Sequence, residues 1–178
     1  MSLEIRIAAA ADAVAACNVL RRSITACVDD HRNDSAILDA WLGNKNPQTV
    51  ASWFESPTNC SIVAVEDGDV IGVALLTVAG KLALCYVLPE ARGHGAGKAM
   101  LAKAEETACA WGVKTIQLHS TTTGEGFFAR YGYQHSGHVR SPYGVDTVLY
   151  WKQLDGAEGP APAPIDGKRK RFCNCNSG

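Results

Sequence analysis

The chain has 178 residues, of which 47% are hydrophobic and 20% charged, a composition typical of one globular domain. Its formal net charge of −1 gives no electrostatic sign of a protein that binds nucleic acid or an anionic membrane. No apolar run approaches about 18 residues and the N-terminus lacks the pattern of a signal peptide, so we expect no membrane span and a cytoplasmic protein. The seven cysteines are then expected to be reduced thiols.

Hydrophobic periodicity and turn signals divide the first half of the chain into short elements. Residues 3–7 alternate and predict a strand, and Asp12 is placed to cap a helix that runs to about Cys27. Asp34 or Ser35 begins the next short helix. This helix is predicted to end near Gly43. A helix at 47–54 that starts with Pro47 follows, and then a hairpin of strands 61–66 and 70–78 across Asp67-Gly68.

A glycine-rich loop follows a predicted strand at 82–88 and Pro89. It reads Arg92-Gly93-His94-Gly95-Ala96-Gly97-Lys98, and apolar residues at 100, 101, 104 and 108 mark one face of the helix after it. Its glycines let backbone amides approach a phosphate at a helix N-terminus, where the dipole favours an anion, and Arg92 and Lys98 add positive charge. The pattern therefore predicts a site for a phosphorylated ligand; a glycine turn that only starts a helix is the alternative.

Spacing excludes two common phosphate-binding loops. A Walker A loop needs glycine where Arg92 stands and Ser or Thr where Ala99 stands, which also argues against a nucleotide-dependent phosphotransferase. A dinucleotide-binding loop needs G-x-G-x-x-G, whereas this loop reads G-x-G-x-G.

The remaining predicted elements are a strand at 114–120, a short helix that carries Phe127 and Phe128 after a turn at 121–124, and strands at 133–139 and 145–152.

Two motifs together carry a family resemblance over roughly residues 3–152. Arg92 to Gly97 reads R-x-x-G-x-G and is preceded by V-x-P at 87–89, and residues 127–133 resemble F-Y-x-x-x-G-[FY] about 35 positions later. Both motifs, in this order and separation, resemble those of the GNAT superfamily of N-acetyltransferases. The resemblance implies an α/β (α+β) domain at 1–154. Its central sheet would be mixed and mostly antiparallel, with about seven strands, flanked by helices and splayed at the acetyl-CoA cleft.

The resemblance also implies a chemistry and a set of site residues. Acetyl-CoA would be the co-substrate, with no metal, and an amine would attack the thioester directly in a ternary complex. The backbone N–H of Val87 would polarise the thioester carbonyl. The implied coenzyme-binding residues are Tyr86, Val87, Leu88, Arg92, Gly93, His94, Gly95, Ala96, Gly97, Lys98, Thr121 and Phe128.

The acid and base residues of many family members are replaced here. Their Glu or His positions match Lys81 and Ala83, and the tyrosine that protonates the leaving group matches Phe128. His119, near the end of a strand that lines the cleft, is the candidate catalytic base, and a packed core histidine is the alternative. Cys85 lies among apolar neighbours, which favours an inert thiol over a covalent acetyl-cysteine.

The acceptor pocket has weaker signals. Asp29, Asp30 and His31 fall between two predicted helices, where the family builds this pocket, and their acidity suits a cationic amine; a solvated loop is the alternative. Trp41 is a candidate wall of the pocket or a core residue. The expected acceptor is a small-molecule, amino-acid or protein amine, with no nucleic-acid or membrane partner and a homodimer through the last strands. An acyl-CoA-binding regulatory module that has lost catalysis is the alternative function.

Residues 155–178 differ in character from the rest of the chain. A proline-rich stretch is followed by Lys168-Arg169-Lys170-Arg171 and a Cys-x-Cys pair at 173–175. With one aromatic residue and almost nothing to bury, this tail is expected to be disordered. Contact of the basic run with nucleic acid and metal binding by the cysteine pair are the alternatives, and two thiolates fall short of a tetrahedral zinc site.

Overall fold

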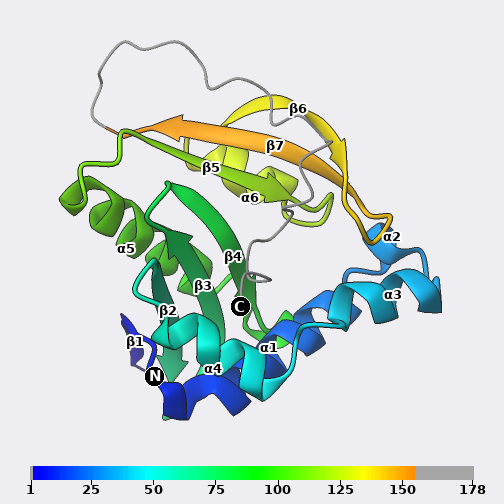
Figure 1. The fold of residues 1–178 in the computed structure, drawn as a ribbon, viewed down its shortest axis with the longest axis horizontal. Helices are drawn as coiled ribbons and strands as arrows, with labels where there is room; N and C mark the ends of the chain where they lie inside the picture. The colour runs from blue at the N-terminus through cyan, green and yellow to red at the C-terminus, as the bar shows by residue number, and fades with distance from the viewer. Residues whose placement is uncertain (1, 155–178) are drawn as a thin grey trace.

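The computed structural model describes residues 2–154, so the tail predicted at 155–178 lies outside the described residues (Figure 1). A seven-stranded sheet has the strand order β1-β2-β3-β4-β5-β7-β6, and only β4 and β5 are parallel neighbours. The predicted mixed, mostly antiparallel sheet is therefore confirmed. The strands are β1 (Leu3–Ile7), β2 (Asn59–Glu66), β3 (Asp69–Thr77), β4 (Lys81–Val87), β5 (Thr115–Ser120), β6 (Gln134–Arg140) and β7 (Asp146–Gln153).

Six α-helices and two 3-10 turns flank this sheet within the described residues. They are α1 (Ala13–Thr25), α2 (Val28–His31), α3 (Ser35–Leu42), α4 (Pro47–Glu55), α5 (Ala96–Ala110) and α6 (Glu125–Arg130), with 3-10 turns η1 (Ala10–Asp12) and η2 (Pro89–Ala91). The sequence pattern predicts no helix at 28–31, between the first two predicted helices, and the helix α2 corrects this. One turn of helix is too short to show a periodicity, and α2 ends at once because Arg32 adopts a left-handed φ of 54°.

Of the two aspartates predicted as helix N-caps, Asp34 caps its helix with its side chain and Asp12 does not. The Asp34 carboxylate accepts hydrogen bonds from the N–H groups of Ala36 and Ile37, as an N-cap does. Asp12 was predicted to cap α1, but it lies in η1, where its carboxylate accepts from the Ala9 N–H at 2.8 Å and from Arg6 at 2.7 Å. The ion pair with Arg6 on β1 therefore takes the carboxylate away from the first turn of α1.

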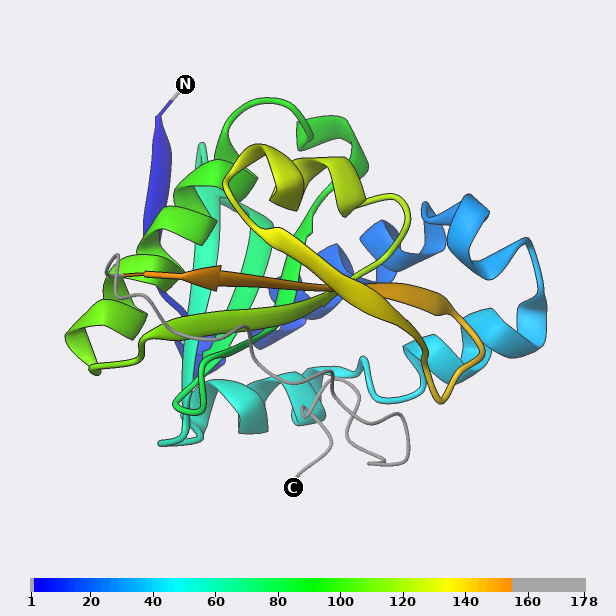
Figure 2. The ribbon, with the colours of Figure 1, turned by 90° about the horizontal axis from the view of Figure 1, so that it is seen from above.

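Helices cover both faces of the first half of the sheet. α1 and α4 pack on one face and α5 packs on the other (Figures 1 and 2). Because of this, β2 and β3 are buried along almost their whole length and read as continuous apolar runs rather than alternating ones. The described helices are too short or too polar to cross a membrane.

The sheet opens between its two central strands. β4 and β5 pair only at Lys81 with Gln117 and Leu82 with Leu118, and beyond these pairs the two strands diverge. A register shift between Leu75 and Leu76 in the pairing of β3 with β4 lies beside the point of divergence. The unit β5-β7-β6 is therefore turned away from the unit β1-β2-β3-β4 (Figures 1 and 2), and the predicted splay is confirmed.

Candidate functional site

A pocket of about 450 Å³ opens where β4 and β5 part. Its walls come from the end of β4, the glycine loop, the end of β5 with residues 120–124, and α6. This volume suits a small-molecule site. The predicted site residues that line it are Tyr86, Val87, Arg92, Gly93, Gly95, Gly97, Lys98, His119, Thr121 and Phe128, whereas the predicted coenzyme-binding residues Leu88, His94 and Ala96 lie outside this lining.

The glycine loop forms an open cradle at the N-terminus of the 15-residue helix α5. Gly93 and Gly95 have φ values of +82° and +94°, a region that side chains other than glycine rarely adopt. A Cβ built at either position meets nothing within 4 Å, so the space in front of the loop is open. Backbone N–H groups, the helix dipole and the nearby Arg92 and Lys98 together give this space the character of an anion site. These residues fit the pyrophosphate of a coenzyme A.

The strand register decides which backbone groups of β4 face the opening. The Leu88 N–H donates to the Ile71 carbonyl at 2.8 Å, so Leu88 and Ile71 of β3 form a hydrogen-bonded pair. In an antiparallel ladder such pairs alternate, and the backbone groups of Cys85 and Val87 therefore point away from β3, towards the splay. Val87 keeps its predicted place, whereas the backbone of Leu88 belongs to the sheet.

His119 lines the pocket as a half-buried side chain. Burial, helped by the positive charge of Lys81, lowers its pKa from the ordinary value of 6.5 to about 4. The imidazole is therefore neutral at pH 7 and is a weak acceptor of a full proton. The thiol of Cys85, which also lines the pocket, is a poor nucleophile because burial raises its pKa to about 12.

Aromatic rings of α6 form one wall of the pocket. Phe128 is buried and packs edge-on against Phe127, with ring centres 5.0 Å apart. A Cβ on Gly97 would approach the Phe127 ring to 3.2 Å, so glycine at this position allows α6 to pack on the start of α5. Tyr131 contacts Phe127 from the next turn and also lines the pocket. Its phenol lies three residues beyond Phe128, which occupies the position of the usual acid.

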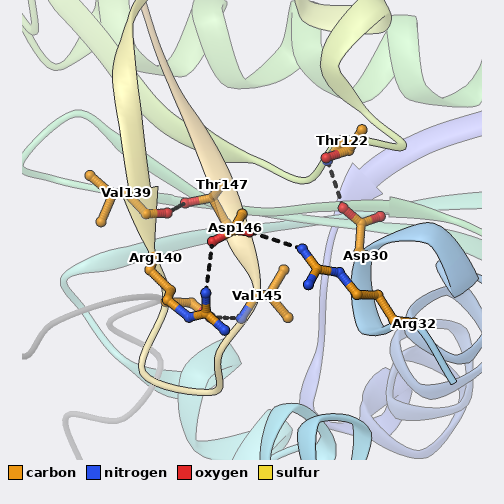
Figure 3. Close-up of polar contacts among 9 residues, drawn as sticks. Asp30, Arg32, Thr122, Val139, Arg140, Val145, Asp146 and Thr147 are labelled. Atoms are coloured by element: carbon orange, nitrogen blue, oxygen red, sulfur yellow. Dashed lines mark hydrogen bonds and ion pairs between the residues drawn. The ribbon is translucent and has the colours of Figure 1, made fainter. Parts of the chain in front are cut away.

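Two of the predicted acceptor residues, Asp30 and His31, have structural hydrogen bonds. Asp30 is buried, and its carboxylate accepts from the Thr122 N–H at 2.7 Å and from the N–H and hydroxyl of Thr123 (Figure 3 shows the Thr122 bond). The His31 Nε2 lies 2.9 Å from the Thr25 carbonyl, and its Nδ1 accepts from the Asn33 N–H. This arrangement assigns the neutral tautomer with the proton on Nε2.

Asp29 and Trp41 also lie outside the pocket lining among the described residues. Asp29 is exposed on α2. Trp41 is buried in a second apolar cluster with Ile24, Cys27 and Val145, which joins α1 and α3 to the residue before β7. The sequence left open whether Trp41 is a wall of the pocket or a core residue, and in the structure its indole is packed in the core.

Other residues that line the pocket were not predicted as site residues from the sequence. Among them are Cys27, Thr123, Arg130 and Tyr131. Arg130 and Tyr131 lie inside the second motif, so their position was available as a signal. Cys27 and Thr123 reach the pocket through tertiary contact between the end of α1 and the turn after β5, which no local pattern reports. Within residues 2–154 no group of three or more His, Cys, Asp or Glu residues is arranged to hold a metal ion.

Residues 27–154 match the acetyltransferase (GNAT) domain family. Because this match covers more than half of the 178 residues, the chain belongs to that family. It is an acyltransferase whose co-substrate is acetyl-CoA, as the two motifs predicted. Among curated proteins, none matches the sequence significantly.

Solved structures share this fold at low sequence identity. A GCN5-related N-acetyltransferase from Rhodopseudomonas palustris is 21% identical, with a TM-score of 0.75 over 86% of this chain and 97% of its own. PaiA N-acetyltransferase from Thermoplasma acidophilum, solved with coenzyme A, is 21% identical, with a TM-score of 0.73 over 86% of this chain and 99% of its own. YncA from Salmonella typhimurium, solved with acetyl-CoA, is 17% identical, with a TM-score of 0.68 over 90% and 99%.

Proposed function

We propose that this protein transfers the acetyl group of acetyl-CoA to a primary amine by direct attack of the amine nitrogen in a ternary complex. The observation that carries the proposal is the open glycine cradle at the start of α5, which faces the point where β4 and β5 part. When bound, acetyl-CoA supplies a thioester that is already activated for attack by nitrogen. The amides of residues 93–98, with Arg92 and Lys98, hold the pyrophosphate.

The outward-facing backbone of β4 orients the donor. The backbone groups of Cys85 and Val87 point into the splay and offer an edge to which an extended amide-bearing arm adds like a further strand. The Val87 N–H polarises the carbonyl under attack, as an oxyanion-hole donor does. Support comes from the register, which turns these groups, and not those of Leu88, away from β3.

Solvent, rather than a strong base in the pocket, takes the proton of the amine. An α-amino group has a reference pKa of about 8, so moving its proton to His119, with a pKa of about 4, is uphill by about 5 kcal/mol. We assign His119 the role of a neutral hydrogen-bond acceptor that orients the amine. Phe128 has no proton to give to the leaving sulfur, so the C–S bond breaks with coenzyme A leaving as a thiolate, which takes its proton from solvent. Rate enhancement then comes mainly from positioning the two reactants.

A thermal-shift experiment on the full chain tests donor binding. Coenzyme A and acetyl-CoA at 100 times their dissociation constants are expected to stabilise the fold by about 2.7 kcal/mol, a rise of roughly 5–10 °C in Tm. ATP, whose Walker A signature is absent, is expected to give a much smaller rise. No rise with saturating acetyl-CoA would remove the basis of the proposal. The rate at which the coenzyme A thiol is released from acetyl-CoA in the presence of a panel of amines then tests acetyl transfer.

A second function, binding of acyl-CoA without transfer, is favoured by two observations at the reaction centre. Phe128 replaces the usual acid, and the pKa of His119 lies well below that of a useful base. Under this alternative the protein acts as a regulatory or interaction module. The two functions separate in one assay, because both predict a Tm rise with coenzyme A, but only the enzyme releases thiol faster when an amine is added.

The acceptor and the oligomeric state are further parts of the proposal. The acceptor is a small-molecule, amino-acid or protein amine. A homodimer would form through the last strands, where β6 is the outer strand of the sheet and leaves one backbone edge for pairing. Light scattering coupled to size exclusion tests this: the mass of one chain at micromolar concentration would contradict the dimer.

A further inference from the structure

The end of α1 and the helix α2 bridge the two strands that border the pocket. We call residues 23–31 the α1–α2 corner. At one side, the Ser23 hydroxyl donates to the Val87 carbonyl at 2.9 Å, at the end of β4. At the other side, the Asp30 carboxylate accepts from the N–H groups of Thr122 and Thr123, just beyond the end of β5. These are the ends at which β4 and β5 lie apart, since the two strands pair only at Lys81 with Gln117 and Leu82 with Leu118.

Both anchors of the corner are buried and strongly bonded. Ser23 has no exposed surface and Asp30 is 6% exposed. The carboxylate of Asp30 also accepts from the Thr123 hydroxyl, so one side chain satisfies three donors of the same turn. Hydrogen bonds to an ionised group are about twice as strong as neutral ones. The turn after β5 is thereby held to α2 rather than left to solvent.

The corner is itself tied together and to the hairpin of β6 and β7. The Cys27 thiol lies 3.2 Å from the Ser23 carbonyl, and the His31 ring bonds the Thr25 carbonyl. Arg32, directly after the corner, lies 3.2 Å from Asp146 at the start of β7 (Figure 3). These contacts make the corner a continuous connection between the two halves of the sheet.

The segments that the corner holds are walls of the pocket. Val87 of β4 and Thr123 of the turn after β5 both line the pocket, and Cys27 of the corner lines it as well. An Arg92 nitrogen lies 3.5 Å from the Ser23 carbonyl, so the same serine also contacts the arginine of the phosphate cradle. A change in the length or stiffness of this bridge therefore changes the width of the pocket near Val87.

We infer that the α1–α2 corner sets the width of the cleft and that Ser23 and Asp30 are positioning residues that restrict the donor to a short acyl group. The inference rests on the proposed function, because it needs the thioester near Val87. A longer acyl chain needs more room at this same end of the cleft, where the corner fixes how far β4 and β5 lie apart. Loss of an anchor opens this end, which weakens the grip on acetyl-CoA and removes the bar to longer chains.

Direct binding tests the inference without knowledge of the acceptor. We would measure the dissociation constants of acetyl-CoA and butyryl-CoA by calorimetry for the full chain and for Asp30→Ala. The wild type is expected to prefer acetyl-CoA. In Asp30→Ala, acetyl-CoA binding is expected to weaken by about tenfold while butyryl-CoA binding stays within about twofold, so that the preference collapses. A folded Asp30→Ala with the wild-type preference would overturn the inference.

Two further variants keep the test decisive. Thr123→Val removes only the hydroxyl that donates to Asp30, and it is expected to lower the preference in the same direction if Asp30→Ala does not fold. Glu105→Gln is the matched control, because Glu105 also accepts from two side chains, Tyr133 and Lys152, but does not line the pocket. If Glu105→Gln lost the preference for acetyl-CoA over butyryl-CoA to the same extent, general destabilisation would explain the loss, and the inference would be overturned. Failure of the wild type to bind either donor would instead overturn the proposed function.

Discussion

The donor side of the cleft and the side formed by α2, α3 and the β6–β7 hairpin are built in different ways. On the donor side, residues 92–98 form one continuous segment whose glycines, cations and helix start act together. On the other side, α2, α3, the turn after β5 and the β6–β7 hairpin come from separate parts of the chain. They meet through a buried tryptophan, a buried aspartate that bonds the turn after β5, and a surface ion pair. A local segment can be read as a motif, whereas a site assembled from distant parts is visible only in the folded chain.

The largest expected effect is on the donor side. Gly95→Glu is expected to weaken acetyl-CoA binding by more than about 100-fold, because its side chain enters the open space of the cradle with a negative charge and its backbone must keep a positive φ. Calorimetry measures the affinity. Gly112→Glu is the control, since Gly112 also has a positive φ (+75°) and open space but lies outside the pocket lining. Equal loss in both variants would contradict the donor-site assignment.

Trp41→Ala tests whether this indole is a structural residue. Removal of a side chain that is 3% exposed is expected to cost about 3–5 kcal/mol of the free energy of unfolding, with unchanged affinity of the folded fraction for acetyl-CoA. Denaturant unfolding and calorimetry measure the two quantities. Trp111→Ala, at an indole that is 41% exposed, is the control and is expected to cost about 1 kcal/mol or less. A stable Trp41→Ala with impaired transfer would restore the acceptor role.

The depressed pKa of His119 predicts an acid-sensitive fold. The unfolded chain takes up the proton near pH 6.5, whereas the folded chain resists it down to about pH 4. The stability that His119 contributes is therefore present above about pH 6.5 and is lost as the pH falls towards 4. Between these pH values we expect the Tm of the wild type to fall by about 5 °C more than that of His119→Gln. Parallel pH profiles of Tm in the two proteins would contradict the depressed pKa.

The smallest expected effect is at the surface ion pair in Figure 3. Arg32 and Asp146 are both more than half exposed, and Asp146 also lies 3.6 Å from Arg140. Exposed pairs of this kind contribute little, so Arg32→Ala is expected to change the free energy of unfolding by about 0.5 kcal/mol or less. Denaturant unfolding at low and high salt measures it. A loss above about 2 kcal/mol would contradict this and show that the pair is a main connection between the end of α2 and the hairpin.

Much of the fold could be predicted because its signals are local. The hairpin of β2 and β3 follows from an Asp-Gly turn between apolar runs, and α3 follows from the Asp34 cap. The phosphate cradle follows from glycine spacing. The helix α2 could not be predicted, since one turn lacks a period and its stability comes from the bonds of Asp30 and His31 to other segments. The site assignments themselves stay predictions until binding is measured.

The sequence by itself determined the family, the donor class and the order of the sheet-forming elements, because turn chemistry, apolar periodicity and glycine spacing act over a few residues. Only the tertiary structure decided which way Val87 and Leu88 turn their backbone groups, what Asp30 bonds and how far the pKa of His119 falls. Each of these depends on strand register or on burial by residues that are distant in the chain. Register and burial are properties of the whole packed domain, and no short segment carries them.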